Sequence, residues 1–84
     1  MDNNAAQYYL ASLRDWQLSE MNSFPVEEKV LLKHFPSLSS DSEDAVSQEM
    51  ERLSKIAHHE HLKFKIEETN NGRIFIFEKL ESND

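Results

Sequence analysis

Apolar residues recur along the chain in short stripes separated by polar breaks, and the spacing within each stripe predicts an element. The first stripe lies between Ala5 and Leu18 and consists of Tyr9, Leu10, Leu13 and Trp16. This spacing is helical and predicts a helix whose inner side carries Tyr9 and Trp16 in the core. Tyr8 lies off the stripe, so we expect it on the surface, where it could contact a protein partner.

A second helix is predicted after the polar break at residues 19–24. Pro25 suits the first turn of a helix, where its missing N–H costs nothing. The stripe that follows consists of Val26, Val30, Leu31 and Phe35. Pro36 ends this helix. Residues Ser37 to Ser40 are then expected to form a short extended link, with an edge strand around Leu38 as an option.

The longest helical pattern follows this link. Ser40 and Glu43 have the spacing of a capping box at a helix start. The inner stripe of this third helix consists of Val46, Met50, Leu53 and Ala57, with Ile56 beside it. The polar residues Glu49, Glu51, Arg52 and Lys55 are expected to project elsewhere. The helix should end near His61.

The C-terminal part of the chain alternates with a period of two, which is typical of strands. Leu62, Phe64 and Ile66 alternate with charged residues, and the segment "NNG" at 70–72 is a strong hairpin signal. The return strand is apolar on both faces. A two-residue turn at Asn71-Gly72 would place Phe75 and Phe77 on the face of Phe64, whereas a three-residue turn would place Ile74 and Ile76 there.

Together these elements predict an α+β fold in which two or three helices pack on a small antiparallel sheet that ends in a C-terminal β-hairpin. We expect one domain over residues 5–80, with flexible ends at 1–4 and 81–84.

Composition narrows the class of protein. The chain has no cysteine, so a disulfide framework and a thiolate zinc site are excluded. Its apolar runs are too short to cross a bilayer and no signal peptide is visible, so we expect an intracellular protein of the cytoplasm or nucleus with no membrane partner. The net charge of −7 argues against tight binding to a nucleic-acid duplex.

Basic residues nevertheless gather in one part of this acidic chain. The candidate nucleic-acid-binding set consists of Arg52, Lys55, His58, Lys63, Lys65 and Arg73. On one interpretation these side chains hold the phosphates of a single strand. On the other they are a solvated face, and Lys63 and Lys65 keep a strand edge from pairing with other chains.

Two segments resemble the R-three-H domain, a small module associated with single-stranded nucleic acid and named after an Arg-x-x-x-His signature. The first is "FPSLSS" at 35–40, which is similar to the segment that leads into the family's signature helix. The second is "IAHHEHLKFKIEETNNGRIFIFEK" at 56–79, which resembles the family's second half. The resemblance covers about half of the chain.

This resemblance implies a small α+β module that binds single-stranded RNA or DNA. The family's arginine and histidine would fall at Met50 and Ser54, so the resemblance is to a divergent member that lacks the signature. A winged helix, which also places helices before a β-hairpin, is the alternative fold.

The histidines near the end of the third helix are a second candidate site. His58 and His61 are three residues apart and could share a helix face as two metal ligands, with His34 or Glu60 completing the set. Histidines at a helix C-terminus also interact favourably with the helix dipole and otherwise face water. The second interpretation is simpler, and we expect no metal and no other cofactor.

Catalysis finds little support in the residues. There is no cysteine nucleophile, and a single glycine cannot form a Gly-rich phosphate loop. Ser54 and His58 are four residues apart, but a triad would also need an orienting acid and an oxyanion hole. The sequence therefore predicts a non-enzymatic module without a small-molecule substrate. It would bind single-stranded nucleic acid weakly, or alternatively bind another protein through Tyr8 and the acidic surface as an adaptor or regulator.

Overall fold

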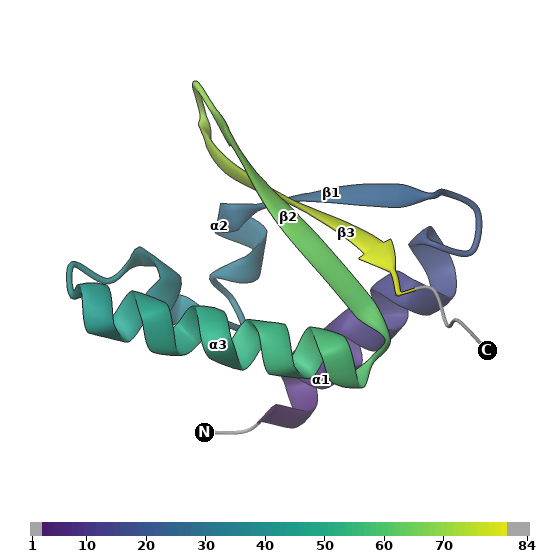
Figure 1. Ribbon diagram of the computed structural model, residues 1–84, viewed down its shortest axis with the longest axis horizontal. Coiled ribbons are helices and arrows are strands. Elements are labelled where there is room, and N and C mark those ends of the chain that lie inside the picture. The colour runs from purple at the N-terminus through teal and green to yellow at the C-terminus, as the bar shows by residue number, and fades with distance from the viewer. Residues whose placement is uncertain (1–2, 81–84) are drawn as a thin grey trace.

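A computed structural model describes residues 3–80 and has the predicted α+β architecture, with helices on one three-stranded antiparallel sheet (Figure 1). Its elements in order are α1 (Asn3–Ser12), a π-helical turn (Leu13–Gln17), β1 (Ser23–Glu27), α2 (Glu28–Leu31), a 3₁₀ turn (Pro36–Ser39), α3 (Glu43–His59), β2 (Leu62–Thr69) and β3 (Gly72–Lys79). The strand order is β1-β3-β2, so β3 is central. Helix α1 begins inside the end predicted to be flexible, and residues 1–2 and 81–84 lie outside the described part.

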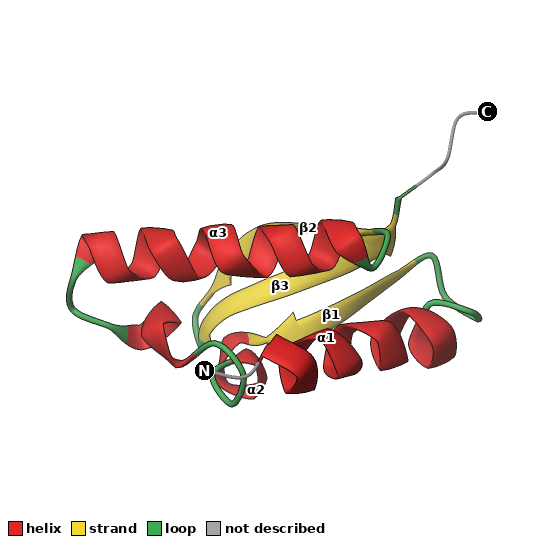
Figure 2. Cartoon of the chain, turned by 90° about the horizontal axis from the view of Figure 1, so that it is seen from below, coloured by secondary structure: helices red, strands yellow, loops and turns green. Residues whose placement is uncertain are grey.

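The two faces of the sheet have different surroundings. Helices α1 and α3 lie side by side beneath one face (Figures 1 and 2). On that face Phe77 lies between Phe24 of β1 and Phe64 of β2, and Phe75 lies between Val26 and Ile66. Phe75 and Phe77 are fully buried. The opposite face, which we call the open face, carries the alternate residues, including Lys63, Lys65 and Ile76.

The first helix ends in a π turn, and this turn changes which residues face the core. The Leu18 N–H donates to the Leu13 carbonyl at 3.0 Å, an i→i+5 bond that aligns Leu18 with Leu13. Both leucines are buried. Trp16 is therefore turned outward and is 75% exposed, so its predicted place in the core is wrong. Tyr9 is half-buried and stacks on His34, with ring centroids 5.0 Å apart.

The segment around Pro25 is a strand, which corrects the predicted second helix. Val26 pairs with Phe75 of β3, and a proline is tolerated in β1 because this strand lies at the sheet edge. The helical part is only the four residues of α2, although Leu31 is buried as expected. The tertiary pairing of β1 with β3 outweighs the local helix signal.

The link before α3 is a 3₁₀ turn and not the predicted extended segment. The turn begins at Pro36, and the Ser39 hydroxyl donates to the Pro36 carbonyl at 3.1 Å. Leu38, which belongs to the turn, is buried. Ser42, not Ser40, caps α3: its hydroxyl accepts a bond from the Ala45 N–H at 3.3 Å. The predicted capping box is thus wrong by two residues.

Helix α3 and the hairpin follow the sequence pattern closely. Leu53 and Ala57 are buried, and the helix ends at His59, near the expected end. The hairpin turn is formed by Asn70 and Asn71, since Thr69 pairs with Gly72. This turn lies one residue before the predicted one, yet it places Phe75 and Phe77 on the face of Phe64, as the two-residue alternative required. Within residues 3–80, no helix is long and apolar enough to cross a membrane.

Candidate interaction surfaces

The two arginines of the predicted nucleic-acid set form ion pairs inside the fold. Arg52 donates to Glu49 at 2.7 Å and to the His34 carbonyl at 3.0 Å, and its guanidinium lies over the ring of Phe35. Glu49 was expected to project away from the inner stripe, but it is buried. Its second carboxylate oxygen accepts a hydrogen bond from the Ser37 N–H at 2.9 Å. Arg52 thereby ties α3 to the segment around the 3₁₀ turn.

Arg73 is held in the same manner near the hairpin end of the sheet, on the face that carries Phe75. Its guanidinium forms two bonds to the carboxylate of Glu28, at 3.0 and 2.9 Å, and a third to the Leu38 carbonyl at 3.3 Å. These bonds to Arg73 lower the pKa of the Glu28 carboxyl, although partial burial opposes the shift. This bidentate pair fastens α2 to β3.

The other four members of the set lie on two opposite surfaces. Lys55 and His58 are exposed on α3, and Lys55 pairs with Glu51 at 3.5 Å. Lys63 and Lys65 stand on the open face, which no described helix covers, and Lys63 lies 3.7 Å from Glu78. The fold thus brings the two strand lysines together and separates them from the helix residues.

The histidines do not gather into a metal centre in the described part of the chain. Among residues 3–80 no group of three or more His, Asp or Glu side chains could hold a metal ion. His58 is exposed on α3, whereas His34 stacks on Tyr9. His61 has a φ of 62° and ends the helix in the left-handed conformation that usually favours glycine.

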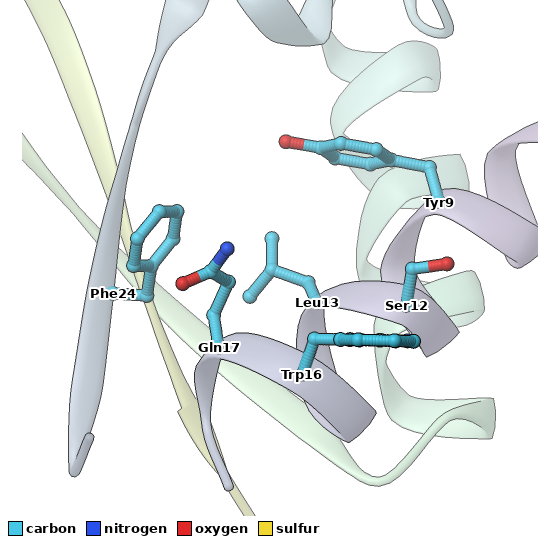
Figure 3. A pocket seen from close by; sticks show the side chains of 6 residues that line it. All are labelled: Tyr9, Ser12, Leu13, Trp16, Gln17 and Phe24. Atoms are coloured by element: carbon cyan, nitrogen blue, oxygen red, sulfur yellow. The ribbon is translucent and has the colours of Figure 1, made fainter. Parts of the chain in front are cut away.

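Helix α1 and the π turn that follows it each present one large aromatic side chain to solvent. Tyr8 is 77% exposed, as predicted, and Trp16 is 75% exposed. A groove runs along the helix beside Trp16, and Figure 3 shows its lining, with Phe24 of β1 across from the π turn. Its lining residues are Tyr9, Ser12, Leu13, Trp16, Gln17 and Phe24. Burial raises the pKa of the Tyr9 hydroxyl, which stays neutral and can donate a hydrogen bond.

A buried carboxylate fixes α1 against the end of α3. Glu60 accepts bonds from Gln7 at 2.8 Å and from Arg14 at 3.0 Å, and Nδ1 of His59 lies 2.9 Å away. Arg14 also donates to the Glu60 carbonyl at 3.1 Å. The bonds from Gln7 and His59, together with the charge of Arg14, lower the pKa of the Glu60 carboxyl. A second groove, bordered by Gln7, Tyr8 and Ala11, opens beside this carboxylate.

Sequence patterns alone did not predict that Trp16 is exposed or that Glu60 is buried. The signal for Trp16 was absent, because a π turn leaves no mark in a 3.6-residue periodicity. Glu60 lies between exposed histidines in the sequence, so nothing nearby indicates that it is buried. Its partners Gln7 and Arg14 lie 53 and 46 residues earlier in the chain.

Comparisons with known proteins give no further assignment. No family model matches the chain, and neither the curated proteins nor the solved structures provide a significant match. The R-three-H resemblance and the winged-helix alternative therefore stay predictions from the sequence.

Proposed function

We propose that the protein is a non-enzymatic protein-binding module that uses the outer surface of α1 and of the π turn that follows it. The observation that carries the proposal is the exposure of Trp16, 75% accessible beside an apolar groove. Trp and Tyr are the residues most enriched at the energetic centres of protein interfaces. Tyr8 on α1 and Trp16 on the π turn are both directed to solvent, so neither ring is needed to pack the core.

The surface is rigid enough to serve as a binding site. Leu10 and Leu13 anchor α1 in the core, and the Glu60 network fixes the helix from the side. An anchored helix loses little conformational entropy on association, which favours affinity. The side chain of Trp16 can then bury apolar area against a partner at low ordering cost.

Charge indicates the kind of partner. The chain carries a net charge of −7, so electrostatic steering favours a basic protein surface. The apolar groove beside Trp16 requires an apolar anchor on that surface. We therefore expect the partner to present an apolar side chain flanked by lysines or arginines.

Capture with matched variants tests the proposal. Wild-type protein, Trp16→Ser and Tyr8→Ser are immobilised and exposed to nuclease-treated lysate, with the exposed α3 substitution Gln48→Ser as control. We expect a basic protein to bind the wild type and the control and to be lost with Trp16→Ser. Its titration against purified wild type should shift the fluorescence of the single tryptophan to the blue. Partners that bind all four forms equally would contradict the proposal.

Weak binding of single-stranded nucleic acid is the second candidate function. It is supported by the position of Lys63 and Lys65 on the open face, where Lys65 forms no ion pair with any residue in 3–80. The half-buried Ile76 lies directly opposite Lys65 in the sheet and could contact a base. Lys55 and His58 lie on α3, on the opposite surface of the molecule, so they would have to contact nucleic acid separately.

A titration with labelled single-stranded RNA and DNA at low salt distinguishes this candidate. We expect micromolar binding that weakens with salt and is lost in the double variant Lys63→Glu/Lys65→Glu. The double variant Lys29→Glu/Lys33→Glu, at two exposed lysines outside β2, changes the net charge equally and is the matched charge control. An affinity unchanged by the double variant, or no binding at high micromolar protein, would rule the candidate out.

A further inference from the structure

The two edges of the sheet differ in how open they are to another strand. Edge strand β1 has five residues with Pro25 in the middle, and a proline supplies no N–H to a neighbouring strand. Edge strand β2 has eight residues and no proline. From Lys65 to Thr69 all its side chains are exposed. One edge is therefore closed to strand pairing, whereas the other is available.

The hairpin geometry determines which groups of β2 point to this free edge. A two-residue turn is closed by a hydrogen-bonded pair, here Thr69 and Gly72. Hydrogen-bonded pairs then recur at every second residue, so Lys65 and Glu67 bond to β3. The N–H and C=O groups of Phe64, Ile66 and Glu68 consequently point away from the sheet and are free for a neighbouring strand.

The charges of β2 are complementary to a second, antiparallel copy of the same strand. An arrangement centred on Ile66 places Lys65 of each copy opposite Glu67 of the other, and Ile66 opposite Ile66. Centring on Lys65 would place two lysines opposite each other, and centring on Glu67 would place two glutamates opposite each other. Only the register on Ile66 places both Lys65 and Glu67 opposite a residue of opposite charge.

We propose that two copies of the protein associate through β2 and form one continuous antiparallel sheet of six strands, two sets of the observed three. The segment that would pair projects beyond the helices, as the hairpin tip in Figure 1 shows. Phe64 is half-buried against the core, while Ile66 is 36% exposed and gains cover from its symmetry mate. The open face of the sheet stays accessible in the dimer.

The pattern of lysines also has a protective interpretation, in which Lys63 and Lys65 prevent edge pairing. The two interpretations differ in the role of Glu67. Protection needs only repulsion between lysines, whereas self-association needs Glu67 opposite Lys65 of the other copy. A charge exchange between Lys65 and Glu67 separates them.

Sedimentation velocity over a range of protein concentrations is the measurement. We expect wild type to form a dimer whose fraction rises with concentration. Lys65→Glu and Glu67→Lys each place like charges opposite each other twice, so each should raise the dimer Kd about tenfold or more. An equimolar mixture of the two variants should form a heterodimer, and the double exchange Lys65→Glu/Glu67→Lys should restore self-association. Lys55→Glu, on α3, should leave the dimer unchanged.

A backbone variant provides the second arm. Ile66→Pro removes an N–H at the free edge and leaves the bonds to β3 in place, as Pro25 does in β1. Circular dichroism first confirms that the variant is folded, and its dimer should be lost. A wild type that stays monomeric at millimolar concentration would overturn the proposal. So would single charge variants that dimerise as well as wild type, or a folded Ile66→Pro variant with an unchanged dimer.

Discussion

Two aromatic residues of β3 and two in the N-terminal helical segment stand in opposite relations to solvent. Phe75 and Phe77 of β3 are fully buried, whereas Tyr8 of α1 and Trp16 of the π turn are 77% and 75% exposed. Phe75 and Phe77 form the core with Phe35, Leu10 of α1 is buried among the core residues, and Tyr9 packs against it. The difference shows that Tyr8 and Trp16 lie outside the set of rings that holds the fold together. Substitutions in the two sets should therefore have different effects.

The largest effect on stability is expected from the sheet. Phe77→Ala removes a fully buried ring that lies between Phe24 and Phe64, and it should lower the free energy of unfolding by about 3–5 kcal/mol. Urea denaturation followed by circular dichroism measures the loss. The neighbouring Ile76→Ala, on the open face, is the control and should cost clearly less. Equal losses would contradict the assignment of the two faces.

A smaller effect is expected at the network that joins α1 to α3. Glu60→Gln keeps the size of the side chain but removes the charge that Arg14 contacts, and it should cost about 1–3 kcal/mol. Glu51→Gln on the exposed side of α3 is the matched control. An unfolding free energy equal to that of the control would show that the network does not hold α1.

The pH dependence of stability tests the same carboxylate. Because the folded protein lowers the pKa of Glu60, its contribution is fully present above the ordinary value of 4.5 and is lost as the pH falls through the lowered pKa. Glu28 acts in the same direction through Arg73. Melting temperatures between pH 7 and pH 2 should fall on the acid side, and Glu60→Gln should reduce that fall. A variant curve parallel to the wild-type curve would exclude Glu60 as a contributor.

The smallest effect on stability is expected at Trp16. Trp16→Ser removes a large side chain that is already in water, so the free energy of unfolding should change by no more than about 0.5 kcal/mol. The same urea titration, followed by circular dichroism because the variant lacks tryptophan, measures it. A loss comparable to that of Phe77→Ala would show that Trp16 packs on the fold and would break the comparison.

Local patterns were sufficient to predict α3 and the hairpin, because both are defined by neighbours in the sequence. Helix α3 has an amphipathic stripe and an acidic first turn, and β2 and β3 are joined by a two-residue turn. Strand β1 was not predictable in this way. Its partner β3 lies about fifty residues later in the chain, and Pro25 carried a local helix signal that this pairing outweighs.

The candidate sites were predicted only in part, for a related reason. The exposure of Tyr8 followed from its position off the helical stripe. The ion pair of Arg73 did not follow, because its partner belongs to a distant part of the chain. Glu28 lies 45 residues before Arg73. Pairs at such a separation leave no periodic signal in the sequence.

The π turn at Leu13–Gln17 determines how this part of the chain can vary in length. A π turn contains one residue more than an α turn, and residues four or five apart can both align along a helix. A sequence with one residue fewer between Leu13 and Leu18 could therefore keep both leucines buried in an ordinary α turn. The single-residue difference would be absorbed on the outer side, where it would redirect Trp16. An insertion or deletion there would alter the exposed surface around Trp16 and spare the core.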